Sequence, residues 1–151
     1  MKIASFAAVL LALAATAAAE DRSAQIVSAP DAPVRLTSAK VLNSGAEPLV
    51  LLYGAVNSTS SPIDTFTVTV YVFGADNRLK ARQVAPARRE LAVGETKYSA
   101  MVLDVGTIEA TDYLMAGVDQ VQRAGSDDWW RVDLRAVAES AAAAKAPPKK
   151  K

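Results

Sequence analysis

The sequence predicts an all-β protein built as an antiparallel β-sandwich, and three observations support this prediction. Short runs rich in Val, Leu, Thr and aromatic residues are broken by Gly, Asn, Asp, Ser and Pro at the intervals typical of β proteins. Between residues 34 and 123 no stretch has the apolar spacing of an amphipathic helix. The 151 residues are enough for one domain with a real core, so these runs belong to a single sandwich.

The amino terminus has the pattern of a secretory signal peptide over residues 1–19. Lys2 precedes an apolar stretch and an Ala17-x-Ala19 site, which predicts cleavage before Glu20. The alternative is a membrane anchor, but about 17 Ala-rich apolar residues fall short of the roughly 20 that a spanning helix needs. The chain also has no cysteine to carry a lipid. We therefore expect a bacterial protein that is periplasmic or secreted, with no integral membrane segment after processing.

Charge and composition exclude several function classes. Without Lys2, the mature chain has 16 Lys and Arg against 16 Asp and Glu, and four of these lysines lie after residue 144. Residues 20–140 are therefore net acidic and have no electrostatic reason to bind nucleic acid. Since the chain has neither Cys nor His, thiolate nucleophiles, Ser-His-Asp triads, Cys/His zinc sites and His-ligated haem are excluded. We predict no enzymatic activity and no cofactor.

The chain before the domain is predicted to be a flexible leader. Residues 20–33 are small and polar and include Pro30 and Pro33. The β-sandwich domain is expected over residues 34–134.

The first two strands are predicted from apolar runs that end in turn residues. The first covers Val34–Leu42 and stops at Asn43-Ser44-Gly45, and the second covers Leu49–Asn57 and stops at a Ser-rich turn before Pro62.

The third strand is the clearest, because apolar residues alternate with Thr and Tyr through Asp64–Phe73. Its predicted core face consists of Phe66, Val68, Val70 and Val72. A turn at Gly74-Ala75-Asp76-Asn77 leads into a charged return strand over residues 78–84, which Pro86 ends. Such a charged strand is expected at the edge of a sheet.

Further strands are predicted over Thr96–Leu103 and Tyr113–Val121. For Trp129–Leu134 we expect a strand, although Trp130 and Leu134 also fit helical spacing. About seven strands suit an immunoglobulin-like or fibronectin-like sandwich. The Ala/Lys/Pro-rich tail, residues 135–151, is expected to form a frayed helix followed by disorder.

Three segments between Leu49 and Leu103 resemble the FxLYD-type family of bacterial extracytoplasmic β-sandwich domains. They are Gly54-Ala55-Val56-Asn57-Ser58, the strand and turn from Val68 to Asn77, and Leu91-Ala92-Val93-Gly94-Glu95-Thr96. The resemblance implies a non-catalytic module and carries no active-site residues.

The candidate binding residues are aromatic side chains expected to leave the core, namely Tyr71, Phe73, Trp129 and Trp130. Tyr71 and Phe73 lie on the Thr side of their strand, and adjacent tryptophans in a strand point to opposite faces. Such a surface suits an interaction module that binds an envelope protein. Two alternatives are a carbohydrate- or cell-wall-binding module that uses the same rings, and a tryptophan near Tyr71 that packs under the Ala-rich tail and binds no partner.

Two charged groups are candidate sites. The acidic residues between Asp104 and Asp112 suggest calcium, although their spacing matches no calcium-loop pattern. A basic set suggests an anionic polymer, although exposed charge also protects an edge strand from adding further strands. The basic set is Arg78, Lys80, Arg82, Arg88 and Arg89.

Overall fold

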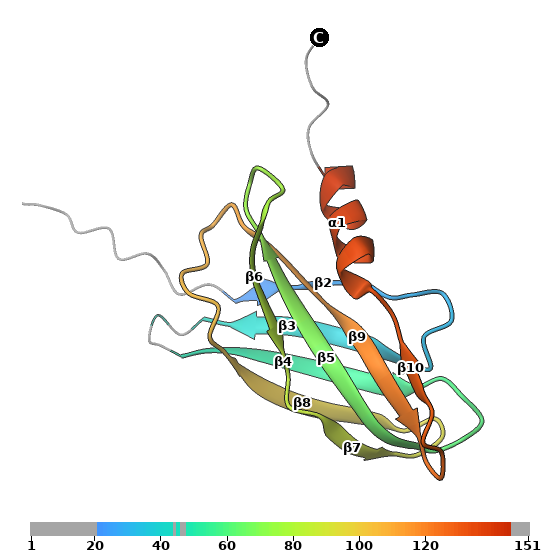
Figure 1. Ribbon diagram of the computed structural model, residues 1–151. Coiled ribbons are helices and arrows are strands. Elements are labelled where there is room, and N and C mark those ends of the chain that lie inside the picture. Colours follow the sequence, from blue (N-terminus) through green and yellow to red (C-terminus); the bar gives the residue numbers. More distant parts are fainter. Residues whose placement is uncertain (1–20, 44, 46–47, 146–151) are drawn as a thin grey trace, which may run out of the picture.

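The computed structural model describes residues 21–43, 45 and 48–145, so the predicted signal peptide lies outside the described residues. Two β-sheets form the body of the molecule, and one helix lies against the outside of one sheet (Figure 1). The predicted all-β sandwich is confirmed. Its immunoglobulin-like or fibronectin-like character stays a prediction.

The first sheet, which we call sheet A, has four antiparallel strands in the order β1-β3-β4-β8. These strands are β1 (Arg22–Ser23), β3 (Val34–Leu42), β4 (Leu49–Asn57) and β8 (Thr96–Leu103). The predicted bounds of β3, β4 and β8 are confirmed. Among the described strands, β8 forms one edge of this sheet.

The second sheet, sheet B, is built around the long antiparallel pair of β5 and β9. Its strands are β2 (Gln25–Ile26), β5 (Ile63–Phe73), β6 (Leu79–Val84), β7 (Arg88–Leu91), β9 (Tyr113–Arg123) and β10 (Trp129–Arg131). β6 and β7 follow one another along the same side of β5, while β10 and β2 pair with the far side of β9. The charged strand β6 lies at the sheet edge, as predicted.

The core lies between the two sheets, and alternate residues of the strands point into it. Phe66, Val68 and Val70 of β5 are fully buried in it, and Val72 is buried as well, so the predicted core face is confirmed. They face Leu51 and Tyr53 of β4 across the sandwich core. Alternation sends the intervening residues of β5 to the outer face of sheet B.

A β-bulge in sheet B places a carboxylate on that outer face. Thr67 lies opposite Gln120 and Val68 lies opposite Val118, so Asp119 is an extra residue in β9. The bulge keeps Val118 and Val121 in the core while Asp119 leaves it.

The expected flexible leader is wrong over the described residues, because it forms β1 and β2. The Arg22 guanidinium donates hydrogen bonds to the carbonyl oxygens of Glu109 and Asp112, both at 2.7 Å. The Val27 amide donates to the Ala116 carbonyl at 2.9 Å. Each strand has only two residues, which is too short for a period to appear in the sequence.

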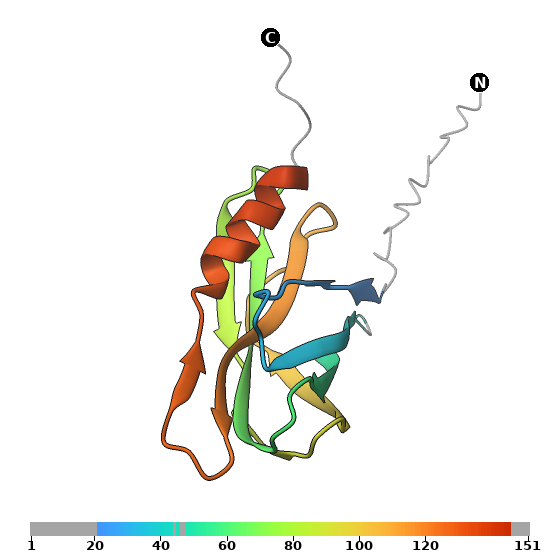
Figure 2. The same cartoon turned by 90° about the vertical axis from the view of Figure 1, so that its right-hand side faces the viewer.

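The helix predicted in the tail is confirmed as α1 (Leu134–Lys145), but it is not frayed, because it packs on the outer face of sheet B. Figure 2 shows α1 lying along β5 and β9 on the side away from sheet A. The helix buries Leu134, Ala138 and Ala142, which are spaced four residues apart. The domain therefore extends beyond residue 134, to Lys145, and residues 146–151 lie outside the described part. Within that part, no helix is long and apolar enough to cross a membrane.

Candidate functional site

Tyr71 and Phe73 project from the outer face of sheet B, as the alternation predicted, but α1 covers them. Their side chains are 1% and 0% exposed, and their rings stack at 6.4 Å between centroids. They pack with Met115 and with Leu134 and Ala138 of the helix. The prediction that Tyr71 and Phe73 belong to an exposed binding surface is therefore wrong. These two rings pack under the Ala-rich tail, where a tryptophan was expected as the alternative.

Trp129 and Trp130 lie on β10 and point to opposite faces. Trp130 packs against the sandwich core and donates its indole N–H to the Asp31 carboxylate at 3.1 Å. The guanidinium of Arg131 lies 5.6 Å from the centroid of the Trp129 ring, which is a cation–π contact. Both tryptophans are half-buried.

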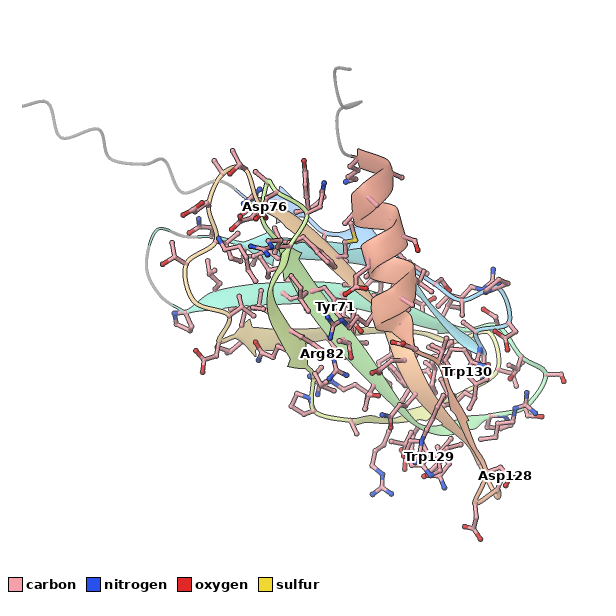
Figure 3. The ribbon with its side chains drawn as sticks, turned by 45° about the horizontal axis from the view of Figure 1, so that its top comes forward. Tyr71, Asp76, Arg82, Asp128, Trp129 and Trp130 are labelled. Atoms are coloured by element: carbon pink, nitrogen blue, oxygen red, sulfur yellow. The ribbon has the colours of Figure 1, made fainter. Side chains whose placement is uncertain are left out.

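The four predicted aromatic residues do not form one surface. Tyr71 is paired with Met115, whereas Trp129 is paired with Gln122, seven positions further along β9. In Figure 3 the two tryptophans accordingly lie away from Tyr71, beyond the start of α1.

A polar cluster surrounds the bulge residue Asp119 next to the first turn of α1. The hydroxyl groups of Thr67 and Thr69 donate to its carboxylate at 2.9 and 2.8 Å, and the Arg82 guanidinium lies 3.7 Å away. Burial raises the pKa of Tyr71, which the nearby Arg82 only partly offsets. This cluster lines a hollow of about 230 Å³, and its carboxylate is already bonded to the chain itself. It therefore holds β5, β6 and β9 in register beneath the helix.

The candidate calcium loop, residues 104–112, holds the ammonium group of Lys80. Lys80 donates to the buried carboxylate of Asp112 at 2.7 Å and lies 3.9 Å from Glu109. The hydrogen bond to Asp112 raises the pKa of Lys80. Among the described residues, no three acidic side chains gather in a way that could hold a metal ion.

Arg88 of β7 and the neutral Gln83 of β6 bind the protein itself. Arg88 donates to the Ala100 carbonyl at 2.8 Å and to the Tyr53 hydroxyl at 3.1 Å. Gln83 donates to the Val102 carbonyl at 2.9 Å. These side chains occupy backbone acceptors on the free edge of β8, which protects that edge from strand addition.

The surface that the sequence analysis missed is the outer face of sheet A. β4 and β8 send apolar side chains to this face, including Leu52, Tyr98 and Val102, which are 39%, 76% and 55% exposed. Among the described residues, six large apolar side chains are exposed, and these three share one face. No described element covers them, in contrast to the outer face of sheet B.

A ridge and a groove lie side by side on this face. The Tyr98 ring leans over Gly54 so closely that a Cβ atom there would lie 2.9 Å from Tyr98 Cε1. Beside it, Leu52 and Ala100 form the floor of an apolar groove of about 560 Å³, with Ser38 and Lys40 along its side.

The sequence contains a signal for this face, but it has two interpretations. The residues of β4 that point outward, Val50, Leu52 and Val56, are as apolar as those that point inward, Leu51 and Tyr53. Such a pattern is typical of a strand that is buried on both faces of its sheet. Among residues 21–43, 45 and 48–145, α1 is the one helix, and it covers sheet B, so no described helix covers the outer face of sheet A.

The segments that resemble the FxLYD-type family have structural roles. Asn57 is buried, and its amide donates to the carbonyls of Ser61 at 2.8 Å and Leu91 at 3.2 Å. Glu95 closes the following turn by accepting the Ala92 amide at 2.8 Å. Two of the three segments thus meet at one end of the sandwich.

Comparison with known proteins gave no relative: no protein-family model, curated protein or solved structure matches the chain. Membership of the FxLYD-type family stays a prediction.

Proposed function

We propose that the chain is a non-catalytic exported module of the bacterial cell envelope that binds a protein through the outer face of sheet A. The observation that supports this function is the unequal cover of the two sheets. The outer apolar face of sheet B is closed by α1, whereas Leu52, Tyr98 and Val102 remain in contact with water on sheet A. An apolar patch of this kind on a folded domain is typical of an interaction site.

The composition of the face suits a protein partner. Its centre is apolar and aromatic, and its margin is polar, with Ser38 and the Lys40–Asp21 ion pair at 2.7 Å. Protein interfaces have this arrangement, and tyrosine is enriched among their strongest contacts. Burying a fully exposed leucine side chain contributes about 1.5–3 kcal/mol. Leu52 contributes less than this, because its side chain is already partly covered.

Export is supported by the sequence pattern of residues 1–19, and a non-catalytic role by the residue types. Without Cys or His, acid–base chemistry depends on carboxylates, lysines and tyrosines. The two most buried carboxylates, Asp112 and Asp119, accept hydrogen bonds from Lys80 and from Thr67 and Thr69.

Glycan binding is the second candidate, and the geometry favours it less. Sugar rings stack on aromatic platforms, but Tyr71 and Phe73 are buried and Trp129 already faces the Arg131 guanidinium. Tyr98 is on the other sheet. We therefore rank protein binding above carbohydrate or cell-wall binding.

The test is site-specific photocrosslinking in an envelope extract, with residues 20–151 as bait. A photoreactive residue replaces Tyr98 in one bait and Val84 in the control, because Val84 is also exposed, at 42%, but lies on β6. We expect a discrete protein adduct from position 98 only, which excess unlabelled protein suppresses and excess Leu52→Asp protein does not. Equal labelling at both positions, or labelling of glycan alone, would contradict the proposal.

A further inference from the structure

The register of sheet A arranges its outward side chains in rows across the strands. One row consists of Ser38, Gly54 and Tyr98, and the next consists of Lys40, Leu52 and Ala100. Neighbouring rows are about 7 Å apart, since they are separated by two residues of extended chain. The first row carries the ridge, because the Tyr98 ring lies over Gly54, and the second carries the groove.

A ridge next to a groove on the same face makes that face complementary to itself. A twofold axis that runs parallel to the rows and midway between them exchanges the two rows of facing copies. The Tyr98 ring of one copy, which leans from β8 over Gly54 of β4, then faces the groove floor of the other copy, formed by Leu52 and Ala100. On each copy a projecting ring thus meets a hollow, which is the condition for close packing.

We propose that the partner of this face is a second copy of the chain, packed sheet A against sheet A about this twofold axis. The inference rests on the proposed function, because it uses the same surface and names its occupant. Each Tyr98 ridge lies in the groove of the other copy, and strands of the two copies align within the roughly 30° usual for packed sheets.

The charges at the margin are compatible with this packing. Lys40 is paired with Asp21 of its own copy at 2.7 Å and faces the uncharged Ser38 of the other copy. The symmetry therefore places no like charges opposite one another at the centre.

The free edge of β8 offers a less suitable route to a dimer. The carbonyl oxygens of Ala100 and Val102 already accept hydrogen bonds from Arg88 and Gln83. Joining two β8 strands would break these bonds, whereas packing the faces keeps them.

The size of the face sets the expected affinity. Three strands, β3, β4 and β8, lie about 4.8 Å apart and are eight or nine residues long, and β1 adds only two residues, so the face presents a flat area of roughly 400 Å². A stable standard interface buries about 800 Å² on each partner. The dimer is therefore expected to be reversible, with a dissociation constant in the micromolar range.

Sedimentation velocity of residues 20–151, from about 1 to several hundred micromolar, tests the dimer. We expect wild type to change from monomer to dimer within this range, and Leu52→Asp and Ala100→Arg to remain monomers with unchanged circular dichroism. Val84→Asp is the matched control, because Val84 is as exposed as Leu52, at 42% against 39%. A wild-type protein that remains monomeric throughout, or a control that loses the dimer equally, would overturn the inference.

Disulfide trapping tests the symmetry. Because the native chain has no cysteine, every disulfide that forms must join the introduced residues. The proposed axis places Ser38 opposite Lys40 of the other copy, with the ridge and groove intact. Oxidation of a mixture of Ser38→Cys and Lys40→Cys proteins should give mainly the mixed disulfide, whose Cβ atoms must approach to about 4 Å. A preference for either homodisulfide, or equal trapping by Val84→Cys, would contradict this packing.

The two proposals can fail separately. If wild type remains a monomer in sedimentation and the photoreactive residue at position 98 crosslinks to another envelope protein, the dimer is overturned and the proposed function stands. A monomer that gives no position-specific adduct overturns both.

Discussion

Gly117 shows how one missing side chain allows sheet B to be covered. A Cβ atom at this position would lie 2.2 Å from the Val27 carbonyl oxygen and 2.8 Å from Leu134 Cδ2. The first contact is with the backbone of Val27, directly after β2, so this segment of the chain would have to move. Glycine here lets both β2 and the first turn of α1 approach β9.

We predict that Gly117→Ala lowers the free energy of unfolding by roughly 3 kcal/mol or more, at the upper end for overpacked sites. The matched control is Gly54→Ala. Its Cβ would meet the exposed side chains of Thr37 and Tyr98, which can rotate away, and we expect a change below about 1 kcal/mol. Urea unfolding of dilute protein, followed by tryptophan fluorescence, measures both. Equal losses would mean that the close approach of β2 is not what Gly117 permits.

Tyr71 links burial to stability at alkaline pH. Burial raises its pKa in the folded state above the ordinary value of about 10. Above that value the unfolded chain loses the phenolic proton while the folded chain retains it, so the contribution to stability is lost as the pH rises through the folded pKa.

We predict that the unfolding free energy of wild type falls more steeply between pH 9.5 and 11 than that of Tyr71→Phe. Tyr98→Phe is the control, because Tyr98 is 76% exposed. Parallel pH profiles for wild type and Tyr71→Phe in urea titrations would contradict the link.

At the scale of elements, α1 covers two aromatic rings with mainly small side chains. Leu134 anchors the first turn, and Ala138 and Ala142 let the helix backbone approach Tyr71 and Phe73 closely. Alanine contributes high helix propensity but little buried area. The attachment of the helix therefore depends on fit rather than on large apolar anchors.

We predict that Ala138→Lys detaches α1 while leaving the sandwich folded. A lysine there would force a charge against buried rings, whereas Ala143→Lys places the same group on the exposed side of the helix. Hydrogen exchange should show at least a tenfold loss of protection in α1, about 1.4 kcal/mol, with β5 and β9 much less affected. Equal effects of the two variants would contradict the docking of this face.

The elements also show what the sequence can predict. Alternation in β5 predicts both its core residues and the outward direction of Tyr71 and Phe73. It does not reveal the cover, because the helical segment has weak amphipathic contrast and its docking depends on Gly117, far away in the sequence. The two-residue strands β1 and β2 depend wholly on tertiary pairing.

The candidate surface was missed for a related reason. β4 is apolar on both sides, so its sequence cannot tell a covered face from an open one. The groove arises only when Gly54 and Leu52 are placed beside Tyr98 and Ala100 of β8, and that register depends on strands far apart in the chain.

At the scale of the whole molecule, the buried residues form two separate clusters. The larger cluster fills the space between the sheets, and the smaller one lies between sheet B and α1. β5 and β9 contribute to both and pair along nearly their full length. The helix contributes only to the smaller cluster.

This division predicts two levels of opening in native-state hydrogen exchange. The amides of α1 should exchange through a local opening at least about 2 kcal/mol below global unfolding, because only the smaller cluster is exposed when the helix leaves. Amides at the centre of β5 and β9 should exchange only on global unfolding, with the full dependence on urea. If α1 and β5 instead show the same free energy and the same urea slope, the helix is an inseparable part of the sandwich, and the closed face of sheet B is as permanent as its core.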